Sequence, residues 1–270
     1  MGEKTLKFKK KYNENKEIEE DYNGATNYNI YRMSKSEWLM YVTLAGIGIF
    51  AIGYIFYRSL IISLILTPLA LKYPKIRTKE IIKKRKNQLT LQFKDMLYSL
   101  SSSIGAGTSI PNSINYVLED MIMQYGDEGC FIVEELKLMK QKLNLGITVE
   151  SVFSDFAKRS GVVDIQTFAN IFDVANRTGG DIIKITRQTS SIIADKIEIK
   201  QEMDAMLAGK KMEQKVLTVI PVALVYFLTV SSGGFMEPLF QGLGRIIATA
   251  ALIIMAIGFV WSRKITDIQI

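Results

Sequence analysis

Two adjacent glycines, Gly179 and Gly180, follow Thr178 and precede Asp181 in the stretch NRTGGDIIKITRQ. Glycine-rich loops can bind phosphate through backbone N–H groups, so this stretch is the first candidate for chemistry in the chain. A P-loop requires the pattern GxxxxGK[ST], and the sequence does not contain it. Asp181 would also place a carboxylate beside the phosphate. Phosphate binding therefore stays the lesser alternative. The stretch favours a turn in which Gly179 ends one helix and Asp181 caps the next.

The composition excludes several kinds of catalytic and metal site. The chain has 270 residues, no histidine and one cysteine, Cys130. Zinc sites of the usual cysteine and histidine kind are therefore excluded, as is a disulfide within the chain. The commonest general base is missing as well. The sequence predicts a protein that is not an enzyme and that has no catalytic residue, metal site or cofactor.

Long apolar segments indicate a membrane protein. Trp38–Tyr57 contains no charge and has aromatic residues at both ends, as expected of a spanning helix. Leu60–Leu71 is apolar but short. Together the two segments would form one helix of about 50 Å, which exceeds the bilayer core, so a hairpin fits better. Val216–Ser232 and Ile246–Trp261 are two further apolar segments. The sequence therefore predicts four transmembrane helices in two hairpins.

Positive charge lies beside these apolar segments. The net charge is +7, and seven Lys or Arg residues lie between Lys75 and Lys86. Such a run can bind nucleic acid, but it contains no interleaved aromatic residues, and its position favours the cytoplasmic flank of a span. With four spans, all the basic clusters can share one side. We expect a multi-pass protein of the cytoplasmic (inner) membrane, with both termini and the central region in the cytoplasm and no nucleic-acid partner.

The central region has the periodicity of helices rather than strands. Apolar residues recur at three- and four-residue intervals in Phe93–Ile104, Val149–Ala157 and Ile165–Phe172. The helix after Asp181 is expected to pack inward through Ile182, Ile185, Thr189, Ile192 and Ile193. The predicted fold class is an all-α integral membrane protein, in which a cytoplasmic bundle of five to six helices lies between two transmembrane hairpins.

Glycines separate the predicted helices. Gly107 is followed by Ser109, and Gly146 by Thr148, so each pair predicts a turn whose hydroxyl residue caps the following helix. The predicted organisation has four parts. These are a polar, mobile tail over 1–37, a first hairpin over 38–72, a helical domain over 73–212, and a second hairpin with a short C-terminus over 213–270.

Three stretches resemble a known family. They are LQFKDMLYSLSSSIGAGTSIPNSI, LGITVESVFSDFAKRSGVVDIQTFANIFDVANRTGGDIIKITRQ and MLAGKKMEQKVLTVIPVAL. With the hairpin–domain–hairpin layout, they resemble the type II secretion F-domain family, the inner-membrane platform proteins of type II secretion and type IV pilus systems. The resemblance covers roughly residues 90–262. The single soluble domain makes the tight-adherence (Tad) pilus proteins TadB and TadC the most similar members. The chain departs from the family at Asn176–Thr178, where a glutamate is often found.

The resemblance implies a non-catalytic scaffold. Such proteins couple a cytoplasmic ATPase, acting in trans, to pilin or pseudopilin subunits in the membrane. The segment Lys200–Lys215, which includes Lys210 and Lys211, would carry motion from the helical domain to the spans. Pro221 would kink the third span, or it is merely tolerated there. Glu237, the one acid of the outward loop, would face a pilin N-terminus, or it is simply solvated.

Small residues on the predicted spans favour close helix packing with neighbours. They are Gly46, Gly48, Gly53, Ala248, Ala250 and Ala251. We therefore expect a homo-oligomer or a complex with a paralogous subunit within the lipid bilayer. Two other functions stay open. The chain could be a membrane-anchored signalling or adaptor protein. A transporter subunit is less favoured, because the spans contain hardly any charge that would mark an ion path.

Overall fold

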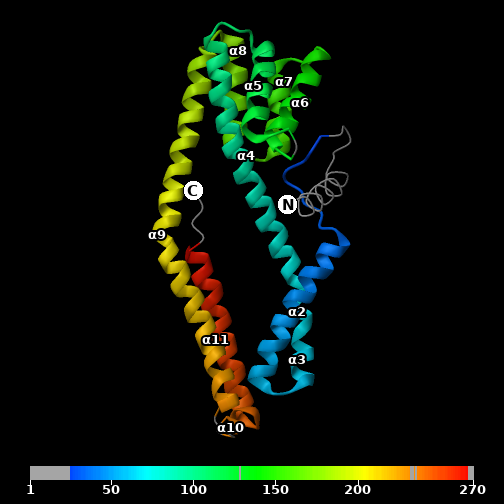
Figure 1. Cartoon of the computed structure of the whole chain (residues 1–270), viewed down its shortest axis with the longest axis vertical. Coiled ribbons are helices and arrows are strands. Elements are labelled where there is room, and N and C mark those ends of the chain that lie inside the picture. The colour runs from blue at the N-terminus through cyan, green and yellow to red at the C-terminus, as the bar shows by residue number, and fades with distance from the viewer. Residues whose placement is uncertain (1–24, 128, 232–233, 235, 267–270) are drawn as a thin grey trace. The chain divides into compact units, whose positions relative to one another are not determined.

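The computed structural model describes residues 25–127, 129–231, 234 and 236–266, and these residues form helices and no strand (Figure 1). The chain divides into two compact units. The helical unit comprises residues up to Ser34 together with Arg77–Glu198, and the apolar unit comprises Lys35–Ile76 and Ile199–Ile270. The all-helical class predicted from the sequence is confirmed for the described residues.

Six helices build the helical unit. They are α4 (Tyr73–Gly105), α5 (Ile110–Tyr125), α6 (Phe131–Asn144), α7 (Val149–Ser160), α8 (Val163–Thr178) and the first part of α9 (Ile182–Ser231). Short turns join them, so successive helices run in opposite directions (Figure 1). The sequence placed domain boundaries at 72 and 212. The compact units instead divide at Ile76/Arg77 and Glu198/Ile199, and a helix runs without interruption through each division.

Aromatic side chains form the centre of the helical core. Phe93, Phe153, Phe156, Phe168 and Phe172 are almost completely buried, and their ring centroids lie 5.0–6.1 Å apart in contacting pairs. Aromatic rings at these separations gain edge-to-face attraction in addition to the free energy of apolar burial. The three apolar faces predicted from the sequence contribute to this core, so the period-3.6 pattern identified the buried faces correctly.

The inward face of α9 agrees with the predicted one except at Ile192, and it includes two small polar residues that were not predicted. Thr186, Ser190 and Ile193 are its buried residues, and the Ser190 hydroxyl donates a hydrogen bond to the Lys94 carbonyl of α4 at 3.0 Å. Ile192, which was expected inside, is exposed. Ile182, Ile185 and Ile193 pack in the core as predicted, so Ile192 is the member of the predicted face that the structure places outside.

The predicted tail over 1–37 is wrong for residues 25–34. Ala25, Tyr28 and Tyr31 are buried, and Tyr28 belongs to the core of the helical unit. We call residues 25–34 the strap, because they cross the helical unit as a non-helical segment. The strap ends where α2 (Lys35–Tyr57) begins, so residues that were expected to be tail pack in the helical unit up to the start of the first apolar helix. Residues 1–24 lie outside the described residues.

Five further elements build the apolar unit together with α9. They are α2, α3 (Leu60–Leu66), the 3-10 helix η1 (Thr67–Lys72), α10 (Glu237–Phe240) and α11 (Leu243–Thr266). Among the described residues, three helices are long and apolar enough to cross a membrane, namely α2, α9 and α11. The predicted second span is not one of them, because its helix is broken into α3 and η1. The structure therefore supports a membrane protein, and three of the four predicted spans by length and composition.

Close contacts hold the apolar unit together. At Gly53, a Cβ atom would lie 3.2 Å from the Ser63 backbone of α3, so glycine is needed for α2 and α3 to pack here. Phe56, Tyr57 and Ala248 form a second buried cluster, and the Tyr57 and Thr249 hydroxyls are hydrogen-bonded at 2.7 Å. Gly53 and Ala248, which were expected to pack against other subunits, thus pack within the chain.

Candidate functional site

The Thr-Gly-Gly stretch forms the turn between α8 and α9. Gly179 has φ 72°, the left-handed conformation that ends α8. The Gly180 N–H donates to the Ala175 carbonyl at 2.7 Å, and the Asp181 carboxylate accepts from the Lys184 N–H at 2.9 Å. Thr178 donates its hydroxyl to the Val174 carbonyl. The N–H groups of both glycines thus bond to the end of α8 rather than point at an open loop, and the backbone has the geometry of the predicted helix turn.

The other two predicted turns have matching backbone conformations. Gly107 has φ 88° and precedes α5, and Gly146 has φ 81° and precedes α7. The Thr148 hydroxyl accepts from the Ser151 N–H, as a capping residue should. Ser109 occupies the same position before α5 with a similar extended backbone, but its side chain makes no capping hydrogen bond. The prediction is therefore confirmed in full for Thr148 and only for the backbone at Ser109.

These three turns lie at one end of the helical unit (Figure 1). We call residues 105–109, 145–148 and 178–181 the distal loops. A hydrogen bond from Asn176 near the end of α8 to Glu150 in the first turn of α7 joins two of them. The chain leaves the helical unit at Ser34, Arg77 and Glu198. Arg77 lies near the start of α4, at the opposite end of that helix from the loop at 105–109. Eight of the twelve residues singled out from the sequence are thus gathered on one surface.

The distal loops expose an apolar side chain. The Leu145 residue is 80 % exposed and Ile147 is 39 % exposed, and both lie in the turn before α7. Gly107, Gly146 and Gly179 have open space where a Cβ atom would be, so their positive φ angles rather than close packing require glycine. An exposed leucine on a surface of rigid turns is a feature of protein contact sites.

The remaining predicted site residues belong to the apolar unit. Lys210 and Lys211 lie on α9 and form exposed ion pairs with Glu213 at 3.0 Å and Asp204 at 2.6 Å. Pro221 lies inside α9, which continues through it. Glu237 is exposed at the start of α10. The twelve residues are therefore divided between the two units, eight in the helical unit and four in the apolar unit.

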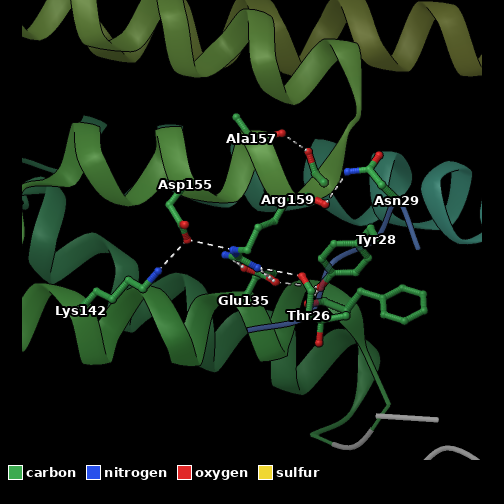
Figure 2. Close-up of polar contacts among 10 residues, drawn as sticks. Thr26, Tyr28, Asn29, Glu135, Lys142, Asp155, Ala157 and Arg159 are labelled. Atoms are coloured by element: carbon green, nitrogen blue, oxygen red, sulfur yellow. Dashed lines mark hydrogen bonds and ion pairs between the residues drawn. The ribbon is translucent and has the colours of Figure 1, made fainter. Parts of the chain in front are cut away.

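A buried ion pair anchors the strap, and the sequence analysis missed it (Figure 2). Arg159 of α7 donates two hydrogen bonds to the carboxylate of Glu135 on α6, both at 2.7 Å. Their side chains are only 8 % and 3 % exposed. Arg159 also donates to the Thr26 carbonyl at 3.1 Å, while the Tyr28 hydroxyl donates to Glu135 at 2.9 Å. One ion pair thus fixes two helices and the strap together.

The electrostatics of this group favour its charged form. Burial and the neighbouring Glu135 carboxylate raise the pKa of Tyr28 well above its ordinary value, so its hydroxyl stays a donor. Burial by itself would lower the pKa of Arg159, but hydrogen bonds and attraction from Glu135 and Asp155 outweigh it and raise that pKa. Burial opposes ionisation of Asp155, yet Lys142 and Arg159 hold its pKa below the ordinary range. Because the folded pKa of Asp155 is depressed, its stabilising contribution is present above the ordinary aspartate pKa and is lost as the pH falls through the lowered value.

The strap also contacts α4. Lys86 donates to the Asn29 side-chain oxygen at 2.7 Å and to the Gly161 carbonyl at 3.0 Å. The Arg85 guanidinium lies 4.5 Å from the centre of the Tyr31 ring, within the range of a cation–π contact. Two members of the basic run after the first apolar segments therefore bind the protein itself. Residues that precede α2 and residues that follow η1 are therefore in contact within the helical unit.

The described residues contain no group of three or more His, Cys, Asp or Glu residues that could hold a metal ion. The one thiol, Cys130, is buried at the start of α6, and burial raises its pKa. Comparison of the chain with known protein families, with curated proteins and with solved structures finds no match. The resemblance to the secretion and pilus platform proteins therefore rests on the sequence stretches alone.

Proposed function

We propose that the chain is a non-catalytic platform protein of a Tad-like type IV pilus or a type II secretion machine, in the cytoplasmic membrane. It couples a cytoplasmic assembly ATPase, bound in trans, to pilin or pseudopilin subunits in the bilayer. The observation that carries this proposal is helix α9. Its first turns pack in the helical core through Thr186, Ser190 and Ile193, and its last part is apolar enough to span a membrane. A single helix of this kind can pass a rotation or shift of the helical unit directly into the bilayer.

The proposed membrane layout has four spans, and the strap supports it. Residues on both sides of the α2–α3–η1 region are bonded to each other, since Asn29 precedes α2 and Lys86 follows η1. If α2 crosses the bilayer, the chain must cross back before Lys86. The α3, η1 and first α4 residues, Leu60–Ile76, would extend about 28 Å, close to the bilayer core of about 30 Å. The interrupted second segment is therefore the return crossing.

The orientation follows from the position of basic residues. Arg77 and Lys79 follow the return crossing, and the α9 lysines from Lys210 to Lys215 precede the apolar part of that helix, so both clusters flank apolar segments at the ends that lead to the helical unit. Arg58 follows α2 and Arg245 lies in the first turn of α11, at the other end of the apolar segments, where the Arg58 guanidinium lies 6.0 Å from the Phe240 ring centre. The majority of basic residues mark the cytoplasmic side. The helical unit is thus cytoplasmic, and the ATPase contacts its distal loops, which lie farthest along the helices from the chain exits.

Capture of partners tests the function. The protein would be cross-linked in intact cells, purified in mild detergent, and its companions identified by mass spectrometry, in parallel with a Leu145→Asp variant. We expect a secretion-type ATPase together with a pilin or a second platform protein. The variant should lose the ATPase but keep the membrane partners, because Leu145 is exposed and its replacement spares the core. Recovery of a kinase or regulator, with neither ATPase nor pilin, would instead support the signalling or adaptor function.

A further inference from the structure

Helix α9 exposes three large apolar side chains in line. Ile192, Ile199 and Met206 are 47 %, 50 % and 81 % exposed. They are spaced seven residues apart, which is close to two turns of helix, so they share one face. Met203, four residues after Ile199 and three before Met206, lies on the same face with the spacing of a coiled-coil seam, and Lys196 occupies the corresponding position between Ile192 and Ile199. We call these four residues the α9 stripe.

Charges of opposite sign flank the stripe. Helical geometry places Asp195 and Glu202 along one edge and Lys200 along the other. In a parallel pair of helices, the acidic edge of one faces the basic edge of the other, and Asp195 is offset from Lys200 by the five residues that such a pairing requires. In an antiparallel pair, like charges would meet. Charge complementarity therefore selects a parallel partner of the same kind.

The membrane imposes the same orientation. Two copies inserted with the same topology are related by an axis along the membrane normal, so their α9 helices run parallel. This step rests on the membrane-embedded part of the proposed function and not on its role in a pilus or secretion machine. Three of the small residues that the sequence offered for association are already used within the chain, since Gly46 faces η1, Gly53 faces α3 and Ala248 is buried.

From the spacing, exposure and charge pattern we infer that the α9 stripe is a dimer interface, which packs in parallel against the α9 stripe of a second copy of this chain. The ion pair of Lys211 with Asp204 and that of Lys210 with Glu213 are exposed and within one helix. Such surface pairs contribute little and do not compete with the seam. The interface lies just outside the apolar part of α9, where pairing would hold two platforms at a fixed separation.

Disulfide cross-linking in native membranes tests the interface. In a Cys130→Ser background, single cysteines would be introduced by Ile199→Cys and Met206→Cys, with Ala208→Cys as the matched control on the opposite face of α9. Mild oxidation should give covalent dimers at both stripe positions and about tenfold less at the control, since a seam position faces its own copy in a parallel pair. Cross-linking at both stripe positions requires a parallel dimer. In an antiparallel pair, only one position along the helix can lie opposite the same position of the second copy.

Charge exchange tests the register. In the Ile199→Cys background, Asp195→Lys alone and Lys200→Asp alone should each reduce the dimer about tenfold through like-charge contact, and the two together should restore it. The inference is overturned if inserted protein gives no dimer at the stripe, equal dimer at the control, or a cross-linked product with a different protein. Protein missing from the membrane fraction would contradict the membrane layout instead, which distinguishes the two failures.

Discussion

Replacement of Glu135 by alanine is expected to lower the free energy of unfolding of the helical unit by about 3–5 kcal/mol, the cost of leaving one partner of a buried ion pair uncompensated. Arg159 would stay in the protein interior without the carboxylate that accepts two of its hydrogen bonds. Tyr28 would lose its acceptor as well. The strap would therefore loosen together with the contact between α6 and α7.

The chain offers a convenient reporter for this measurement. Cys130 is the single cysteine and is buried in the helical core, so its reaction with a maleimide in increasing urea follows unfolding of the helical unit. The matched control is Asp127→Ala, which removes an exposed ion pair with Lys137 and should change the free energy of unfolding by less than about 1 kcal/mol. Equal stability of the two variants would show that the Arg159 pair does not anchor the strap.

A double-mutant cycle separates the pair from its surroundings. The variant Glu135→Ala with Arg159→Ala removes both charges and should cost less than the sum of the two single changes, because no buried charge is left alone. Additive costs would mean that the two side chains act independently, contrary to their bidentate contact.

Insertion of about six Gly and Ser residues after Gly209 is expected to abolish fibre assembly or secretion while the protein stays folded and inserted. Helix α9 is continuous through Gly209, and a flexible insertion would interrupt it between the helical core and the apolar segment. If α9 transmits motion, the coupling is lost even though both ends keep their packing. Counting of surface fibres or secreted substrate gives the readout.

Gly209→Ala is the matched control for this insertion. No atom lies within 4 Å of the Cβ that alanine would add, and alanine favours the helix by about 1 kcal/mol over glycine. This variant should assemble fibres at the normal level. Slow maleimide reaction at Cys130 and recovery in the membrane fraction would verify folding and insertion. Normal assembly by the insertion variant would argue against transmission through α9.

The sequence predicted the helical core well because burial there follows one simple period. Phe93, Phe153 and Phe168 each belong to a run of apolar residues that recur at three- and four-residue intervals along one helix, and each is buried. The turns at Gly146 and Gly179 were also predictable, since only a residue tolerant of positive φ fits such a position. Local signals of this kind need no knowledge of the rest of the fold.

The strap and the face of α9 depended on tertiary contacts that leave no local period. Tyr28 and Tyr31 stand in a polar stretch, and their burial involves partners distant in sequence, such as Glu135 for Tyr28 and Arg85 for Tyr31. The two aromatic residues among asparagines were the one signal that could have identified an ordered segment. Ile193 is buried while Ile192 is exposed, because the close approach of α9 to α4 depends on Ser190. The predicted second span is not a single α-helix, because the 3-10 helix η1 begins at Thr67 and Pro68 and interrupts it.

The proposal depends most directly on a helical unit that lies on the cytoplasmic side between two membrane hairpins. Single cysteines introduced in a Cys130→Ser background by Ser59→Cys, Lys79→Cys, Lys140→Cys and Gln241→Cys, and reacted with a membrane-impermeant maleimide, would test this layout. In intact cells, with any outer barrier made permeable, we expect labelling at positions 59 and 241 only, and in inverted vesicles at positions 79 and 140 only. Labelling of position 79 from the same side as position 59 would show that Leu60–Ile76 does not cross back, and would contradict the four-span platform.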